Sequence, residues 1–266
     1  LPGNDEQDWD KVLWSAGAKY NLTPAVSIYT NAGSSFVAPS LKSVGGIIAL
    51  ADKGVAGKNG QLPNPGLDPE SGIGYDLGVD LKPIDSLKLG VRGFYNLVDD
   101  QIVTVVVNSD PSQSQDINAG ETTSYGVELS VEHRLADWMK WFANYTYTDT
   151  EISNNNDPDQ DGAEVPFVPE HMGNVGFDVK LPLDFSASVT LHVSGPIYDS
   201  TSKSGRQEFD GYEVLNASLK KRLLSSQAYK VDAYVDLYNL TDKEYEMPWQ
   251  FQDPGFSVLG GIKVNF

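Results

Sequence analysis

Alternation of apolar and polar residues with a period of two is the feature that most limits what this chain can fold into. Between residues 73 and 82 one set of alternate positions holds Ile73, Tyr75, Leu77, Val79 and Leu81, and the other holds Gly74, Asp76, Gly78, Asp80 and Lys82. Successive side chains of a β-strand point to opposite faces, so this pattern predicts a strand with one apolar and one polar face.

The same division recurs along the whole chain. Two further examples are the apolar sets Tyr125, Val127, Leu129, Val131 and Val231, Ala233, Val235, Leu237. About eleven such segments occur, starting near residues 10, 25, 72, 86, 118, 138, 170, 184, 208, 227 and 255. No segment shows a convincing helical period, so the fold is predicted to be all-β.

The predicted connections alternate between tight and long. The tight ones are Asn21–Pro24, Lys82–Ser86, Leu135–Asp137, Leu181–Asp184 and Leu223–Ser226, and the long ones are residues 35–71, 108–118, 152–168, 199–208 and 241–255. Outer-membrane barrels have this asymmetry, with short periplasmic turns and long extracellular loops. The pattern therefore predicts an antiparallel transmembrane β-barrel.

Composition agrees with this prediction and excludes several other classes. Mean hydropathy is -0.32, and a barrel keeps such a modest value because its strands alternate. No run approaches the ~18 consecutive apolar residues of a spanning helix. The chain has no cysteine, and its net charge of -18 argues against nucleic acid as a partner. It starts at Leu1 without a recognisable signal peptide.

Aromatic residues gather where the predicted strands meet turns or loops. They are Trp14, Tyr20, Tyr29, Trp138, Trp141, Tyr147, Tyr198 and Tyr229. Aromatic girdles mark both lipid interfaces of membrane barrels, so we interpret these residues as girdle positions. Ordinary strand aromatics are the alternative interpretation of these residues, and a soluble β-sandwich is a third interpretation of the fold, after a passive barrel.

Several local motifs resemble the C-terminal region of TonB-dependent outer-membrane receptors. They are Phe36-Val37-Ala38-Pro39-Ser40-Leu41, Tyr125-Gly126-Val127-Glu128-Leu129, Ala143-Asn144-Tyr145-Thr146-Tyr147-Thr148-Asp149, Val165-Pro166-Phe167-Val168-Pro169-Glu170-His171 and Tyr238-Asn239-Leu240-Thr241-Asp242-Lys243-Glu244-Tyr245. The chain ends in Gly261-Ile262-Lys263-Val264-Asn265-Phe266, an alternating strand with a terminal aromatic residue. That ending is similar to the signal read by the barrel assembly machinery.

The resemblance implies that residues 1–266 form the C-terminal half of one barrel of about twenty-two strands. The plug domain and the first half of the barrel are then absent from this sequence. The implied function is energy-coupled uptake of a scarce nutrient, such as an iron-siderophore, another metal chelate, a vitamin or a glycan. The implied partners are the lipid bilayer, the rest of the receptor, a TonB-type energy transducer acting through the plug, and the assembly machinery. A passive porin, or a small complete barrel with one strand miscounted, shares the periodicity and stays open.

No catalytic motif is present, so the chain is not predicted to be an enzyme. His133, His171 and His192 do not have metal-ligand spacing, and no nucleophile elbow or phosphate-binding loop occurs. The charged residues of the polar faces are expected to hydrate the barrel lumen or contact the plug. These candidates are Lys88, Arg92, Glu128, Glu132, Asp178, Asp232 and Asp236.

One loop resembles the start of a calcium-binding loop. Asp157, Asp159 and Asp161 occupy alternate positions before Gly162, as carboxylates do at positions 1, 3 and 5 of such a loop. Position 12 is Val168 in place of the usual bidentate glutamate. A solvated acidic loop is the favoured interpretation, with weak calcium binding as the alternative and no other cofactor predicted.

Overall fold

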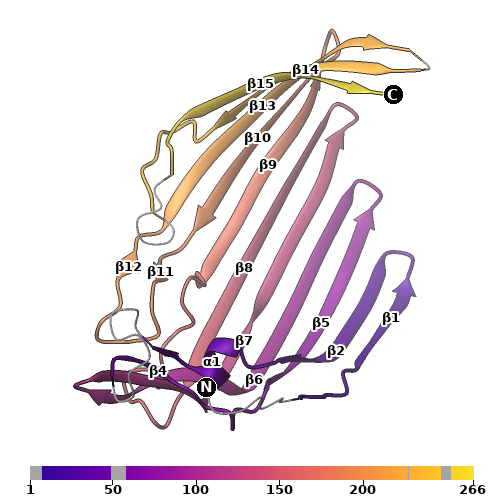
Figure 1. The fold of residues 1–266 in the computed structure, drawn as a ribbon. Helices are drawn as coiled ribbons and strands as arrows, with labels where there is room; N and C mark the ends of the chain where they lie inside the picture. Colours follow the sequence, from indigo (N-terminus) through magenta and orange to yellow (C-terminus); the bar gives the residue numbers. More distant parts are fainter. Residues whose placement is uncertain (1–7, 49–57, 227, 247–252) are drawn as a thin grey trace.

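Eleven strands follow one another across a single antiparallel sheet (Figure 1). The computed structural model describes residues 8–48, 58–226, 228–246 and 253–266. The strands are β1 (Ser15–Thr23), β2 (Val26–Val37), β5 (Glu70–Ile84), β6 (Leu87–Ser109), β7 (Ser112–Ala136), β8 (Met139–Ser153), β9 (His171–Leu181), β10 (Phe185–Ser194), β13 (Tyr212–Ser225), β14 (Lys230–Tyr238) and β15 (Ser257–Asn265). The predicted all-β antiparallel architecture is confirmed.

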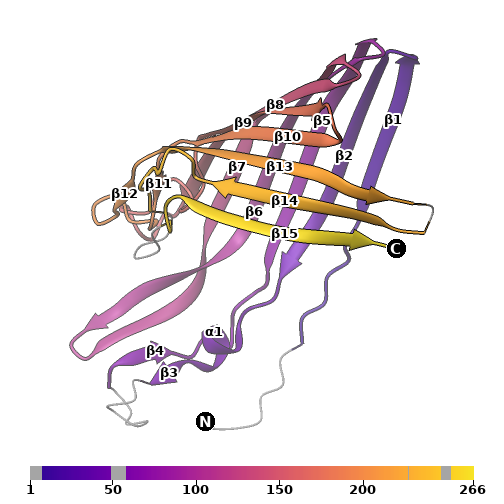
Figure 2. The ribbon, with the colours of Figure 1, turned by 90° about the horizontal axis from the view of Figure 1, so that it is seen from above.

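The sheet curves into an open trough, with β1 and β15 at its two edges (Figures 1 and 2). Among the described residues, β1 pairs only with β2 and β15 pairs only with β14. The edge strands therefore keep unpaired N–H and C=O groups. Such edges are unstable in lipid, where water cannot satisfy them.

The connections between β1 and β2, β5 and β6, β7 and β8, β9 and β10, and β13 and β14 are tight and lie at one end of the strands, here called the tight-turn end. The turns between β1 and β2 and between β5 and β6 each contain two residues, at positions 24–25 and 85–86. Residues 38–69, 154–170, 195–211 and 239–256 make long connections at the opposite end, the loop end. The predicted alternation of short and long connections is confirmed for these segments.

The prediction of a long loop at residues 108–118 is wrong. This region is a hairpin in which Ser109 lies opposite Ser112, and it joins strands of 23 and 25 residues. The β-branched run from Ile102 to Val107 explains the difference, because such residues favour extended backbone and continue the ladder beyond the expected end of the barrel wall.

The long connections contain small elements of their own. The segment between β2 and β5 forms α1 (Leu41–Gly45), β3 (Ile47–Ile48) and β4 (Gly60–Leu62), and β4 pairs with β7. Ser40 caps α1 by accepting a hydrogen bond from the Ser43 N–H at 3.0 Å. A separate two-stranded hairpin, β11 (Ile197–Tyr198) and β12 (Glu208–Phe209), lies between β10 and β13. None of the described helices has the length and apolar character needed to cross a membrane.

Among the residues that the structure describes, no conventional hydrophobic core lies beneath the sheet. The few buried apolar residues, which include Ile152, Ala163 and Phe209, lie near the loop end. Large apolar side chains on one face stay exposed along the strands, such as Leu77 at 59% and Ile262 at 68%. An exposed apolar face of this extent indicates a surface that contacts lipid or a partner protein.

Candidate functional site: the polar wall

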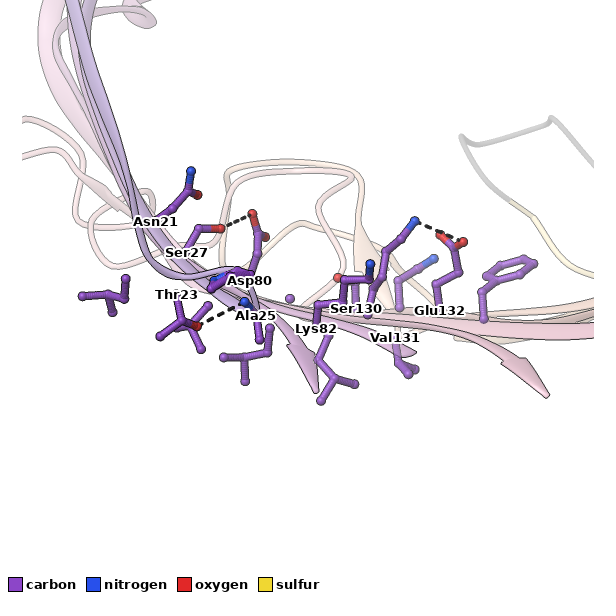
Figure 3. A pocket seen from close by; sticks show the side chains of 18 of the residues that line it. Asn21, Thr23, Ala25, Ser27, Asp80, Lys82, Ser130, Val131 and Glu132 are labelled. Carbon is purple, nitrogen blue, oxygen red and sulfur yellow. Dashed lines mark hydrogen bonds and ion pairs between the residues drawn. The ribbon is translucent and has the colours of Figure 1, made fainter. Parts of the chain in front are cut away.

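The polar face of the sheet is its concave side. In Figure 3, Asn21, Ser27 and Asp80 project from the side toward which the sheet curves. Residues of strands β1, β2 and β5 to β8 line a hollow of about 1080 Å³ there. The curvature and the two-residue period together collect polar side chains from many strands on one surface.

Cross-strand ion pairs cover this wall. On β6, Arg92 Nη1 lies 2.9 Å from Glu128 Oε2 on β7, and Arg92 Nε lies 3.5 Å from Asp76 Oδ1 on β5. Lys88 pairs with Glu132 at 3.4 Å. Arg92 thus joins three neighbouring strands through two carboxylates.

Two more ion pairs continue the pattern across the sheet. Lys140 on β8 lies 3.2 Å from Asp178 on β9. Arg222 on β13 pairs with Asp232 on β14, and that carboxylate is buried. Asp236 accepts a hydrogen bond from Ser218 Oγ at 2.5 Å.

The seven candidates on the polar faces therefore share one surface, but they form separate pairs and not one cluster. Their ion-pair partners Asp76, Lys140 and Arg222 were not predicted as site residues. The alternation assigns each of these partners to the polar face, whereas strand register decides which charges meet. Register depends on pairing over the whole sheet and is not read from one segment.

Glycines opposite aromatic rings form a second recurring contact on the polar wall. The rings of Tyr29, Phe94, Phe142 and Tyr234 lie directly across the ladder from glycines on the next strand, and these glycines are Gly78, Gly126, Gly176 and Gly261. A Cβ atom on Gly176 would lie 2.4 Å from Phe142 Cε1. Only a residue without a side chain leaves room for the ring.

These contacts correct one of the predicted girdle positions. Tyr29 lies on the polar wall, because it is directly opposite Gly78 in the ladder and opposed residues point to the same face. Lys19 Nζ lies 5.6 Å from the centroid of its ring. On the apolar face, Tyr75, Tyr95 and Tyr125 lie opposite one another on three successive strands. All three are exposed, so this row has the arrangement of a lipid-interface girdle.

Tyr198 is also not a girdle residue. It lies in the long connection between β10 and β13, where the Arg206 guanidinium carbon is 3.6 Å from its ring centroid. Arg206 also pairs with Glu164 in the preceding long connection. The hydrogen bond from Arg206 holds the pKa of Glu164 below its usual value despite partial burial. These contacts tie two loops together at the loop end.

The acidic loop around Asp157 also packs against the long connection between β10 and β13. Asp159 accepts hydrogen bonds from Ser202 Oγ and from the Ser204 N–H, and these bonds lower its pKa. Asp157 accepts from the Asp159 N–H at 3.0 Å, and Asp161 accepts from the Asn154 N–H at 3.1 Å. Within the described ranges, no three His, Cys, Asp or Glu side chains are grouped to hold a metal ion. Calcium binding stays a prediction that this geometry does not support.

A buried asparagine organises the last long connection. Asn239, which is 2% exposed, accepts a hydrogen bond from the Lys243 N–H and donates to Asp253 Oδ1, each at 2.9 Å. Tyr245 donates to Asp253 Oδ2 at 2.7 Å and stacks on Tyr212 with ring centroids 4.0 Å apart. Burial first, and then this hydrogen bond, raise the pKa of Tyr245. The connection is therefore anchored to the first residue of β13, at the loop end.

The three histidines lie apart, as their spacing predicts. His192 Nδ1 is 2.8 Å from Asn174 Oδ1 on the polar wall, and His171 Nδ1 is 2.8 Å from the Tyr145 hydroxyl. His133 meets the edge of Trp141, with ring centroids 6.3 Å apart.

The family described as "TonB dependent receptor-like, beta-barrel" matches this chain over residues 2–240. The chain belongs to this family. Its members are outer-membrane proteins, so the bacterial outer membrane is the location of the chain and the tight-turn end faces the periplasm.

Similar curated proteins agree with the family. The chain is 26% identical over 261 residues to the ferrichrome outer membrane transporter/phage receptor of Escherichia coli, with 91% of this chain and 34% of the relative covered. It is 25% identical over 263 residues to the ferrioxamine B receptor of Salmonella typhimurium, with 91% and 36% covered. The chain thus spans about a third of the length of these curated relatives.

A solved structure shows the same fold. The unliganded ferric citrate transporter superposes with a TM-score of 0.72 at 18% identity, covering 95% of this chain and 38% of that protein. The curved sheet therefore corresponds to a section of a receptor barrel.

Proposed function

We propose that this chain forms part of the wall of a receptor that imports a metal chelate across the outer membrane with energy supplied through TonB. The observation that carries the proposal is the family match over residues 2–240, together with relatives named for ferrichrome and ferrioxamine B. A receptor of this kind binds and transports its ligand without chemical conversion, so the proposal does not include an enzymatic activity. No cofactor of its own is required.

The rest of the receptor supplies the parts that this wall section lacks. We assign to it the plug and the strands that close the ring between β1 and β15. The charged residues Lys88, Arg92, Glu128, Glu132, Asp178, Asp232 and Asp236 line the space that such a plug would occupy. The barrel assembly machinery is expected to insert the protein through its C-terminal strand.

A passive porin is the alternative that the relatives disfavour. A porin admits small solutes down their gradient and needs no energy transducer, whereas a coupled receptor imports a bound chelate only when the transducer is present. The two functions therefore differ in their dependence on energy, even though their walls follow the same alternation.

Uptake of radioactive iron tests the proposal. The complete reading frame that contains this chain is expressed in a host without its own siderophore receptors, and ferrichrome and ferrioxamine B are supplied separately as iron chelates. The proposal predicts saturable uptake of a chelate that disappears when the host lacks its energy transducer. Uptake that is unaffected by loss of the transducer would establish the porin instead.

A further inference from the structure

A furrow crosses the apolar face of the sheet near the loop end of β8, β9 and β10. Its volume is about 350 Å³, with Tyr145 on β8 and Leu191 and Val193 on β10 as its walls. Gly173 and Val175 of β9 form its floor. These positions all follow the apolar phase of their strands, so the furrow opens toward lipid and away from the lumen.

A missing side chain creates the furrow. Gly173 lies directly opposite Tyr145 on one side and Val193 on the other. Opposed residues of a ladder point to one face, so three side chains would ordinarily fill this row. The two neighbours are instead 40% and 45% exposed. Glycine within a strand often marks a place where a ligand approaches the backbone closely.

A polar lip closes the furrow at its outer end. His171, the first residue of β9, lines the furrow, and its Nδ1 lies 2.8 Å from the Tyr145 hydroxyl. The Tyr147 ring centroid is 5.4 Å from that of the imidazole. His171 Nε2 is 3.8 Å from Glu170 Oε1, which is too far for a hydrogen bond. The lip therefore offers a carboxylate and an imidazole nitrogen beside an apolar slot.

The lip lies at the height of the outer lipid interface. Tyr147 is directly opposite His171, and two residues further along β8 Asp149 accepts a hydrogen bond from Tyr125 of the exposed tyrosine row at 2.8 Å. Aromatic rows of this kind lie at the level of the lipid head groups. The four-residue step from His171 to Val175 spans ~13 Å along the strand. The furrow thus runs from the head groups of the outer leaflet into the hydrocarbon.

The polar groups of the lip determine which lipid suits the furrow. Lipid tails are as apolar as leucine side chains, so burial alone does not favour one lipid over the surrounding bilayer. The Glu170 carboxylate only accepts hydrogen bonds, and no lysine or arginine is among the described residues that line the furrow. A phosphate beside the chain would be repelled by this carboxylate, whereas an N–H or O–H donor would be bound.

We propose that the furrow binds one acyl chain of an outer-leaflet glycolipid, joined through an amide and carrying a hydroxyl group near its polar end. The chain lies over Gly173, between Tyr145 and Val193, and its hydroxyl and amide groups hydrogen-bond to Glu170 and His171. The site depends on the outer-membrane location of the chain and not on the identity of the imported ligand, because it is on the face away from the lumen.

Native mass spectrometry of the complete receptor in detergent tests the apolar part of the site. The probes are lipid A, whose chains include amide-linked hydroxyacyl groups, and dimyristoyl phosphatidylethanolamine, whose chains are ester-linked without hydroxyl groups. The parent is expected to bind one lipid A at least fivefold more tightly than the phospholipid. Gly173→Leu fills the furrow and should weaken this binding at least tenfold. Gly93→Leu, at a glycine of the same face opposite Val127, should leave it unchanged.

The lip is tested separately. His171→Leu and Glu170→Ala should reduce lipid A binding to the level of the phospholipid, without changing phospholipid binding. His133→Leu, on the same face near the tight-turn end, is the control, and heat-modifiable migration on a gel verifies that each barrel is folded. Equal parental affinity for the two lipids would show a furrow that accepts any alkyl chain and would overturn the proposal. Equal lipid A binding by the folded Gly173→Leu and Gly93→Leu receptors would also overturn it.

Discussion

The ring of Tyr29 on β2 occupies the space directly over Gly78 on β5, where a Cβ atom would lie 2.2 Å from the ring carbon Cζ. Glycine normally weakens a strand, by ~0.5–1 kcal/mol relative to alanine. Gly78 is nevertheless buried within β5, and the ring replaces the side chain that it lacks. Three further aromatic and glycine pairs repeat this contact, so the polar wall is packed as well as charged.

We predict that Gly78→Ala destabilises the receptor, because the new methyl group displaces the Tyr29 ring. Overpacking of this kind costs ~1–3 kcal/mol. Urea unfolding in detergent measures the loss. Gly93→Ala is the matched control, since the nearest atom to its Cβ is 3.9 Å away. The penalty should shrink in a Tyr29→Ala background, and an equal penalty in both backgrounds would argue against the ring contact.

The bridge made by Arg92 leads to a second prediction. Arg92→Met leaves Asp76 and Glu128 without their shared cation and is expected to lower stability by ~1 kcal/mol, because the site is partly exposed and solvent screens the pairs. The loss should decrease in high salt. Lys82→Met removes the pair with Asp85, whose side chain is 95% exposed, and should have no measurable effect. Equal effects of the two variants would contradict a structural role for the bridge.

The contact between the two long loops should depend on pH. Arg206 binds the carboxylate form of Glu164 and lowers its pKa from the ordinary 4.5. The folded pKa is depressed, so the stabilisation is complete above about pH 4.5 and is lost as the pH falls through the lowered value. Limited proteolysis of residues 154–164 should accelerate over that acidic range.

Substitution of the carboxylate tests the same assignment. Glu164→Gln should make proteolysis of this loop fast already at neutral pH and remove its acid dependence. Glu151→Gln, on the preceding strand, should behave as the parent. An unchanged acid profile in the Glu164→Gln protein would show that another group controls the loop.

The acidic loop is predicted to hold its shape without calcium. Asp159 is engaged by Ser202 and Ser204, so its oxygens are not free to converge with those of Asp157 and Asp161. Calorimetric titration up to about 1 mM calcium, the range of weak extracellular sites, should give identical traces for the parent and for the Asn variant at all three positions. A parental heat signal that the variant lacks would establish a calcium site.

Much of the fold could be predicted from the sequence because strand period and membrane topology are local signals. The alternation of Tyr125 to Val131 assigns the faces of β7 without knowledge of its neighbours. The hairpin at Ser109 and Ser112 was missed because the polar tip of a long strand pair has the composition of a loop. Backbone hydrogen bonds between β6 and β7 keep the hairpin extended, and composition does not reveal such bonds.

The site was harder to predict because it depends on register. Arg92 and Glu128 were both candidates, yet their contact arises only when β6 and β7 align over more than twenty residues. Tyr29 was misplaced for a related reason. An aromatic residue near a turn is typical of a lipid interface. The alternation along β2, however, places Tyr29 on the polar face, where it lies directly opposite Gly78.

The central claim is that the apolar face of this sheet contacts lipid and the polar face contacts an aqueous interior. The chain has no cysteine, so single cysteines at Val127 and Glu128 of the complete receptor can carry spin labels without a background. In outer-membrane vesicles, the label at Val127 should be relaxed by oxygen, which dissolves in lipid, and the label at Glu128 by a water-soluble nickel complex. Equal accessibility of both labels to the nickel complex would contradict the account.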